Sequence, residues 1–218
     1  MPAPSPLDRI RAEQIRSVYH VSPPGLIVAT ISSAIFASIV AASGAVSWHV
    51  VFIFITAQTS QVVLRHLVRR AYLRAADPVG EWRRWALYFC IGTLIGGLVI
   101  GIASLWLMPA GRLDMQLLIW ALICGIVCGA VTAYGAYLPS LFASLVPMVG
   151  IPLVWMIMQA DWQHYAIALS IFAWLVANVE QARRYSATIQ ETVRLRFQNE
   201  DLVADLRREK AIAEEASV

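Results

Sequence analysis

Six apolar stretches constrain this chain more than any other feature of its sequence. A helix that crosses the hydrocarbon core of a bilayer needs about 20 mostly apolar residues. The stretches cover Leu26–Ser43, Trp48–Leu67, Trp85–Met108, Met115–Tyr137, Leu138–Gln159 and His164–Ala182. We therefore predict an all-α integral membrane protein, built as a bundle of six spanning helices over residues 26–182.

The composition agrees with a membrane protein. Only 14% of the 218 residues are charged and 59% are hydrophobic, whereas soluble domains carry about 25% charged residues. The segments outside the bundle, residues 1–25 and 183–218, are too short for a globular catalytic domain of ordinary size.

The junction between the fourth and fifth stretches leaves two readings open. These stretches nearly fuse, and Pro139 is the only residue that would break a helix between them. The sequence is also compatible with five spans, in which one of this pair is a re-entrant segment.

The basic residues predict the orientation of the bundle. Lys and Arg accumulate in cytoplasmic loops because they are not readily translocated. Six spans with both termini in the cytoplasm place sixteen of the seventeen Lys and Arg residues inside, and only Arg112 outside. We expect a multi-pass protein of the bacterial inner membrane, whose outer loops (44–47, 109–114 and 160–163) are too short to form a ligand-binding domain.

The first 25 residues are expected to form a cytoplasmic tail. Between residues 7 and 21 the apolar residues recur at near-helical spacing, which predicts a short amphipathic helix on the membrane surface. A disordered lead-in is the alternative.

Glycine pairs at a spacing of four predict close helix packing. The third stretch reads CIGTLIGGLVIG, and the fourth carries a similar pair. Small residues at this spacing let two helix backbones approach closely. The pairs are Gly92 with Gly96, Gly97 with Gly101, and Gly125 with Gly129. They fit either packing within the bundle or a dimer seam.

A polar strip, TAQTSQ, interrupts the second apolar stretch. Gln58, Gln61 and Arg65 lie at i, i+3 and i+7 and so share one helix face. Polar side chains at this depth are expected to turn inward and find partners. Interhelical hydrogen bonding is the simpler interpretation, and the polar wall of a ligand pocket is the alternative.

A second candidate site lies near the predicted outer surface. His49, Asp161 and His164 fall close to that boundary, where such residues can bind a ligand, sense pH or hold a metal. They come from separate loops without ligand spacing, so no metal site is predicted. The three cysteines, Cys90, Cys124 and Cys128, lie in apolar stretches and are expected to be reduced thiols that pack in the bundle.

The sequence contains none of the usual catalytic motifs. There is no nucleotide-binding loop, no HExxH and no serine nucleophile elbow. We therefore assign no catalytic residue and expect no cofactor and no nucleic-acid partner.

The C-terminal segment, residues 183–218, is predicted to be a continuous helix. It contains neither Pro nor Gly and is rich in helix-forming residues. A heptad with Leu195 and Leu202 at d places Asn199 and Leu206 at a, which predicts a weak two-stranded coiled coil. Four residues off this seam support an alternative packing, namely Ile189, Val193, Val203 and Ile212.

The segment RLRFQNEDLVADLRREKAIAEEAS, residues 194–217, resembles the helix that follows the membrane sensor region in bacterial hybrid sensor histidine kinases. Over the six apolar stretches the likeness is one of layout alone. The resemblance implies a signal-input domain that dimerises through its C-terminal helix and controls a kinase core and a response regulator. The kinase core is then expected beyond Val218, and no histidine of this chain inherits the phosphoacceptor role.

Two other functions fit the same layout. Six-span anchors also precede nucleotide cyclases through a helical linker. A small stand-alone transporter is the third possibility, although we expect no charge at the middle of the membrane, where an ion path usually requires one.

Overall fold

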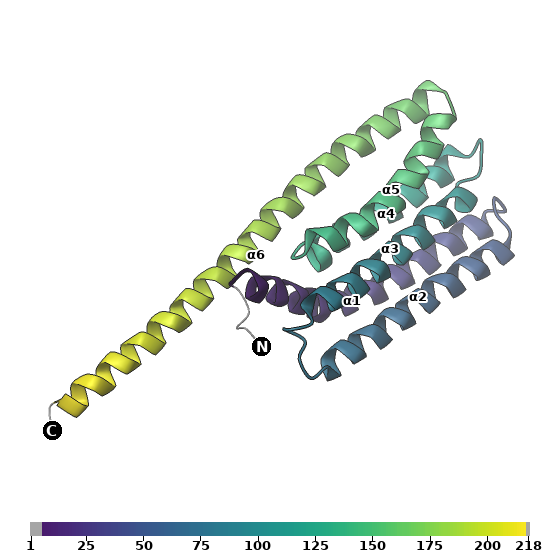
Figure 1. Ribbon diagram of the computed structural model, residues 1–218. Coiled ribbons are helices and arrows are strands. Elements are labelled where there is room, and N and C mark those ends of the chain that lie inside the picture. The colour runs from purple at the N-terminus through teal and green to yellow at the C-terminus, as the bar shows by residue number, and fades with distance from the viewer. Residues whose placement is uncertain (1–5, 217–218) are drawn as a thin grey trace.

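The computed structural model describes residues 6–216, which form six α-helices (Figure 1). They are α1 (Pro6–Ala42), α2 (Trp48–Arg74), α3 (Trp82–Leu107), α4 (Leu113–Tyr134), α5 (Leu138–Met158) and α6 (Trp162–Ala216). Each is long and apolar enough to cross a membrane. The prediction of an all-α fold with six helices able to span a membrane is therefore confirmed.

The chain reverses direction at each turn, so the bundle has two distinct ends (Figure 1). We call one of them the basic end. There α1 begins and α6 leaves the bundle, and there the turn 75–81 joins the arginine-bearing ends of α2 and α3. The opposite end carries the turns 43–47, 108–112 and 159–161. The two ends of the described chain thus lie on the same side of the bundle.

A short turn separates α4 from α5. Tyr137 has an extended backbone (φ −129°, ψ 90°), which ends the helical geometry. Pro139 lies in the first turn of α5, where a missing N–H is tolerated because that donor would have no helical partner. The two helices have 22 and 21 residues, so each is long enough to cross a membrane, which favours six spans over five.

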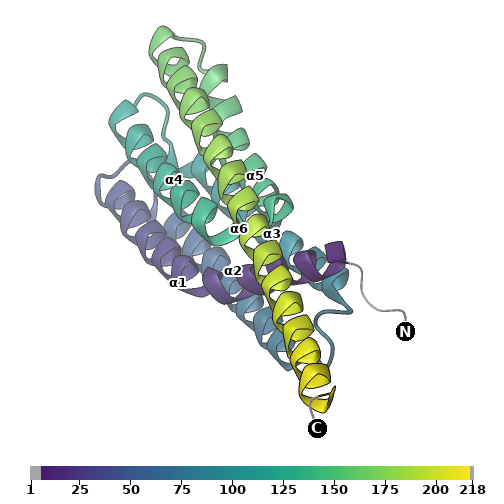
Figure 2. The same cartoon turned by 90° about the vertical axis from the view of Figure 1, so that its left-hand side faces the viewer.

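α1 changes direction near Pro23 and Pro24, and its first part runs across the basic end (Figures 1 and 2). Proline has no N–H, so Pro23 cannot bond the carbonyl of Tyr19 one turn earlier. Nε of Arg69 in α2 donates to that carbonyl instead, at 2.9 Å.

The first part of α1 is packed against the bundle. The sequence predicted a surface helix or a disordered lead-in here, but Ile15, Val18 and Tyr19 are buried. Nε2 of Gln14 donates to the carbonyl of Ala136 in the turn between α4 and α5, at 2.6 Å. This segment therefore ties the turn 135–137 to α1. Residues 1–5 of the expected tail lie outside the described residues.

An aromatic cluster holds α1, α2 and α3 together at the basic end. The ring of Tyr19 stacks on Tyr72, with centroids 4.2 Å apart, and meets Phe89 edge-on at 5.0 Å. The hydroxyl of Tyr19 donates to the carbonyl of Trp85 at 3.0 Å. Such ring pairs add about 0.5–1.5 kcal/mol each beyond the area that they bury.

The glycine pairs differ in their surroundings. A Cβ on Gly97 would collide with the carbonyl oxygen of Ser144, and one on Gly101 with that of Pro147, so α3 and α5 are in close backbone contact there. A Cβ on Gly125 or Gly129 of α4 would have nothing within 4 Å, so this pair makes no close helix contact within the described bundle, and the alternative of a dimer seam stays a prediction.

α6 is a single helix of 55 residues. At 1.5 Å per residue it is about 80 Å long, well over twice the thickness of a bilayer core. It packs beside α4 and α5 and then continues beyond the basic end (Figures 1 and 2).

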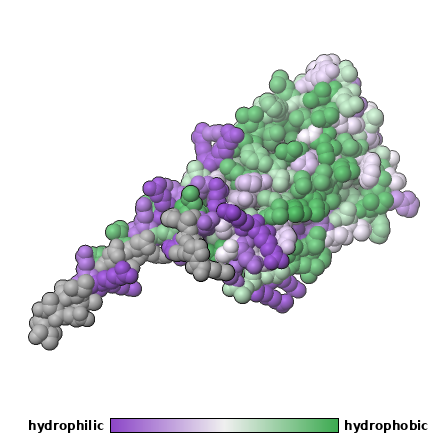
Figure 3. Space-filling view, viewed as in Figure 1, coloured by the Kyte–Doolittle hydropathy of each residue, from purple (hydrophilic) through white to green (hydrophobic). Residues whose placement is uncertain are grey.

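The exterior of the bundle is largely apolar. Figure 3 shows hydrophobic residues over the side of the bundle, with hydrophilic residues gathered toward the basic end and along the projecting part of α6. All six helices leave large apolar side chains exposed, such as Ile27, Phe52, Leu87, Leu117, Val146 and Leu169. An apolar surface of this extent fits lipid as the surrounding medium.

Candidate ligand-binding cavity

α2 turns three polar side chains into the bundle. Gln58, Gln61 and Arg65 are only 2%, 6% and 9% exposed. They occupy the helix face predicted from their spacing, while Phe52 and Ile53 of the same helix remain exposed. α2 therefore presents apolar side chains outward and polar ones to its neighbours.

These three side chains line a cavity of about 450 Å³. This volume falls in the range of small-molecule sites, roughly 300–1,000 Å³. The rest of the lining is mainly apolar or small and comes from α1, α3, α4 and α5. No described residue of α6 lines it.

Two glycines of α3 make room for the polar face of α2. A Cβ on Gly92 would lie 3.3 Å from Cγ of Arg65, and one on Gly96 would lie 3.3 Å from Oε1 of Gln61. Larger residues at these positions would push both polar side chains from their places.

The guanidinium of Arg65 contacts two aromatic rings, which also contact each other with their centroids 5.7 Å apart. Its Cζ is 5.2 Å from the ring centre of Phe89 and 5.0 Å from that of Tyr134. Nη1 donates to the hydroxyl oxygen of Tyr134 at 2.8 Å, whereas the buried Nη2 has no hydrogen-bond partner among the described residues.

This charge lies deeper than we expected from the sequence. Arg65 precedes Arg74, the last residue of α2, by nine positions, which is about 13 Å along the helix axis. No described carboxylate forms an ion pair with it. The sequence has no Asp or Glu between residues 14 and 76 or between 82 and 113, so neighbouring helices offer no acid at this depth.

The cavity has further unpartnered polar atoms. Oε1 of Gln58 and Oε1 of Gln61 are buried without a hydrogen-bond partner among the described residues. An amide can present either its oxygen or its NH₂ group when it turns by half a rotation. The two glutamines can therefore either accept or donate.

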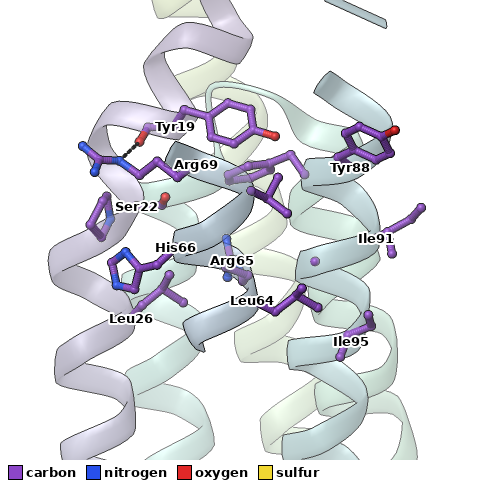
Figure 4. Close-up of a pocket in the computed structure, with 14 residues that line it drawn as sticks. Tyr19, Ser22, Leu26, Leu64, Arg65, His66, Arg69, Tyr88, Ile91 and Ile95 are labelled. Atoms are coloured by element: carbon purple, nitrogen blue, oxygen red, sulfur yellow. Dashed lines mark hydrogen bonds between the residues drawn. The ribbon is translucent and has the colours of Figure 1, made fainter. Parts of the chain in front are cut away.

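A second, smaller cavity of about 110 Å³ adjoins the first at Arg65 (Figure 4). Tyr19, Ser22 and Arg69 line it toward the basic end, and Leu64, Ile91 and Ile95 line its apolar side. Arg65 lines both cavities.

Asp161 and His164 meet at the opposite end of the bundle. Oδ1 of Asp161 accepts from the backbone N–H of His164 at 2.9 Å, and Oδ2 lies 2.6 Å from Nδ1 of the ring. The backbone N–H and the ring of His164 hold the pKa of Asp161 below its ordinary value. Nε2 of His164 faces Oε1 of Gln116 at 2.8 Å, and Nε2 of Gln116 donates to the carbonyl of Pro109. This network ties the start of α6 to α4.

His49 does not join this pair. It is exposed at the start of α2, and the hydrogen bonds of Asp161 and His164 go to each other and to Gln116. Among the residues whose side chains are described, no group of three or more His, Cys, Asp or Glu is arranged to hold a metal ion. Cys90, Cys124 and Cys128 are free thiols.

The two seams proposed for the C-terminal helix differ in exposure. Leu195, Leu202 and Leu206 are 49%, 60% and 64% exposed, and Asn199 is exposed as well. Ile189 packs against the core of the bundle and Val193 is half-buried. The leucine seam is thus open, whereas the alternative seam is covered near the bundle and open at Val203, which is 46% exposed. Ile212 lies outside the residues whose side chains are described.

Sequence reasoning missed two residues of these sites. Tyr134 was not assigned to the cavity, because its partner Arg65 lies 69 positions away in the chain. Gln116 was not linked to His164, which lies 48 positions away. The only local signal for Gln116 was its position as a lone glutamine in the first turn of an apolar helix.

Comparisons of the chain with protein families, curated proteins and solved structures find no match. The fold and its apolar exterior define a multi-pass membrane protein. A mainly apolar cavity with a buried guanidinium lies between α1, α2, α3, α4 and α5.

Proposed function

We propose that this chain is the transmembrane signal-input domain of a bacterial two-component sensor histidine kinase. The continuity of α6 carries the proposal, because one helix runs without interruption from the bundle to the exposed leucine seam. A rotation or shift of this helix inside the bundle would reach residues 195–206 without crossing a turn. The kinase core and its response regulator would be the downstream partners.

A chain of contacts leads from the cavity to α6. Arg65 bonds the hydroxyl of Tyr134, the last residue of α4. The next residue, Gly135, is so close to α6 that a Cβ on it would lie 2.9 Å from Cδ1 of Tyr185. A ligand that favours one position of Tyr134 would therefore bias the position of α6, provided that it binds the two states with different affinity.

The leucine seam supports dimerisation through α6. Leu195, Leu202 and Leu206 fit d, d and a of one heptad, with the exposed Asn199 at a between them. An Asn at a lowers the stability of a coiled coil but fixes its register and two-chain state. Such a marginal seam is suited to a helix that must change its arrangement when a signal arrives.

The basic end is assigned to the cytoplasm in this proposal. Sixteen of the seventeen Lys and Arg residues belong to that side, as the distribution of positive charge in membrane proteins requires. Reporter fusions test the assignment: alkaline phosphatase should be inactive, and green fluorescent protein fluorescent, when either is joined after Val218. Active phosphatase at that position would overturn it.

Disulfide cross-linking in native membranes tests the dimer. With Cys90, Cys124 and Cys128 replaced by alanine, we expect Leu202→Cys and Asn199→Cys to trap covalent dimers. Arg194→Cys, at position c of the same heptad, is the matched control and should not cross-link. Equal cross-linking at all three positions, or none at any a or d position, would remove the paired helix from the proposal.

A further inference from the structure

The cavity carries a net positive charge that no described residue balances. Arg65 is nine-tenths buried, and none of the described carboxylates pairs with it. A buried charge without a counter-charge is costly to maintain inside a membrane bundle. The rings of Phe89 and Tyr134 ease this cost, but they do not neutralise the charge.

Unused hydrogen-bond donors surround this charge. Nη2 of Arg65 has no partner among the described residues. The hydroxyl of Tyr134 accepts from Nη1 of Arg65, so its own hydrogen remains available to a further acceptor. The amide of Gln61, one turn away on α2, can turn its NH₂ group to the same place. Two or three donors around a guanidinium are the usual setting for a carboxylate or phosphate group.

The rest of the cavity lining is mainly apolar, and its polar members are Ser32, Gln58, Thr93 and Ser144. Phe36, Ile100, Leu122, Ile126 and Met148 line the cavity, from four different helices. The charged group is therefore confined to one part of the cavity, and the remainder is suited to hydrocarbon.

The entrance lies between α1 and α4. These helices are joined near one end of the bundle, where Oγ of Ser43 lies 3.6 Å from Sδ of Met115, and near the other, where Gln14 bonds the carbonyl of Ala136. Between these two contacts the lining from α1 and α4 includes five small residues alongside larger apolar ones, namely Gly25, Ala29, Ala121, Gly125 and Gly129. Gly125 and Gly129 are exposed, and a Cβ on either would have nothing within 4 Å. The cavity is thus accessible from the side of the bundle, which an apolar molecule reaches from the bilayer.

We propose that this cavity binds an amphiphilic anion from the membrane, with its carboxylate or phosphate head on Arg65 and Tyr134 and its hydrocarbon tail among the apolar residues of α1, α3, α4 and α5. A cation is repelled by the unpaired Arg65. A neutral amphiphile leaves the charge unbalanced. The inference names the ligand class of the proposed sensor and deepens that function, but the binding itself requires no kinase core.

Binding of decanoic acid to the purified chain in phosphatidylcholine nanodiscs tests the proposal. The carboxyl carbon of the fatty acid is labelled with ¹³C, and its NMR signal is followed during titration. We expect saturable binding of decanoate. Decanoate should also raise the melting temperature of the protein clearly more than decanol or decylamine, which have the same hydrocarbon tail. Arg65→Gln should weaken decanoate binding by at least about tenfold, because it removes a charge-assisted hydrogen bond. Arg70→Gln, an exposed arginine on the same helix, is the matched control and should bind as the unaltered chain does.

A second pair of variants tests the entrance without touching Arg65. Gly129→Leu places a side chain in the open space of the entrance and should weaken decanoate binding while the protein stays folded. Gly150→Leu is its control, since Gly150 has equally open surroundings but does not line the cavity. This pair keeps the proposal testable if Arg65→Gln does not fold.

The source of the head group is distinguished by lipid composition. If decanoate binds less tightly in nanodiscs with phosphatidylglycerol, and Arg65→Gln abolishes the difference, anionic lipid occupies the same site. If lipid composition has no effect, the site is selective for a free amphiphilic acid. Both results support an acid head on Arg65. Equal effects of decanoate and decanol, together with unchanged binding in Arg65→Gln and Gly129→Leu, would overturn the proposal. That result would leave the cross-linking test of the dimer untouched.

Discussion

Arg65 of α2 and Tyr134 at the end of α4 are joined by a hydrogen bond of 2.8 Å, in which Nη1 of the guanidinium donates to the phenol oxygen. Phe89 of α3 covers the same guanidinium with its ring at 5.2 Å. Two aromatic faces and one hydroxyl thus occupy the surroundings in which a buried arginine usually finds a carboxylate. The bundle keeps the positive charge in this way and still leaves Nη2 available.

Tyr134→Phe should destabilise the protein even though both rings are retained. The substitution removes the hydroxyl that accepts from a buried guanidinium, and a hydrogen bond to a charged group contributes about 1.5–3 kcal/mol. Unfolding of the purified protein in detergent measures the loss. Tyr88→Phe is the control, because the hydroxyl of Tyr88 accepts from Arg84 at 3.2 Å on the exposed surface. Equal losses in the two variants would contradict a special role for the buried bond.

Arg69→Met should destabilise the bend of α1 in a manner that depends on Pro23. The carbonyl of Tyr19 loses its donor in this variant, and an unsatisfied buried carbonyl costs about 1–3 kcal/mol. In a Pro23→Ala background the new backbone N–H can bond that carbonyl, so Arg69→Met should then cost clearly less. The double-mutant cycle measures this coupling from unfolding free energies. Additive losses would show that Arg69 does not replace the bond that proline removes.

Gly97→Ala and Gly129→Ala should change stability in opposite directions. The added methyl group at Gly97 meets the carbonyl of Ser144, and overpacking of this kind costs about 1–3 kcal/mol. At Gly129 there is open space, so the higher helix propensity of alanine should add about 0.5–1 kcal/mol. Thermal unfolding of both variants in the same detergent is the measurement. A destabilised Gly129→Ala would mean that α4 is closely packed there in the assembled protein.

The Asp161–His164 pair should make the opposite end of the bundle sensitive to acid. The pKa of Asp161 is lowered in the folded protein, first by the backbone N–H of His164 and then by its ring. A lowered folded-state pKa means that the ionised carboxylate stabilises the fold above the ordinary pKa of Asp, about 3.9. This contribution is lost as pH falls below that value toward the folded-state pKa.

Asp161→Asn isolates the effect of this carboxylate. The unaltered protein should be the more stable of the two near neutral pH, and the two melting temperatures should converge as the pH falls below about 4. A melting-temperature series across pH measures the convergence. Curves that stay a constant interval apart would rule out the carboxylate as the titrating group.

The six helices could be predicted from the sequence because the length of an apolar stretch is a local property. It does not depend on which helices become neighbours in the fold. The break just before Pro139 and the inward face of Gln58, Gln61 and Arg65 also depend on local sequence. The partner of Arg65 could not be predicted, since no local pattern states which helices become neighbours. Tyr134 is one of several aromatic residues near helix ends, and only the packed bundle brings it to the guanidinium.

The glycines show the same limit. Gly97 with Gly101 and Gly125 with Gly129 have identical spacing in similarly apolar helices. The first pair meets the backbone of α5, whereas the second pair lines the entrance of a cavity. The spacing indicates that one face of a helix consists of small residues. Whether another helix packs against that face depends on the fold. The buried first part of α1 follows the same rule, since its periodicity could not reveal what its apolar side would contact.

Asn199→Leu should strengthen the proposed dimer and weaken its response to signals. Asn199 is exposed on this chain, so the substitution removes no contact within the bundle. In a paired helix it replaces a polar residue at position a with leucine, whose burial contributes about 1.5–3 kcal/mol per chain. If the chain is the input domain of a sensor kinase, as proposed, we expect in that kinase a higher fraction of cross-linked dimer from Leu202→Cys and a smaller change in autophosphorylation between signal-free and stimulated states.

Gln190→Leu separates this effect from a general gain in hydrophobicity. It makes the same amide-to-leucine change on α6, but position 190 is at f of the heptad, away from the seam. Dimer yield and autophosphorylation should therefore remain those of the unaltered protein. If both variants raised the dimer yield alike, α6 would associate through a less specific apolar surface. If Asn199→Leu alone raised the dimer yield and left the signal-dependent change in autophosphorylation intact, the stability of the seam would not limit switching. The signal would then have to pass as a rotation of the helices that preserves their pairing.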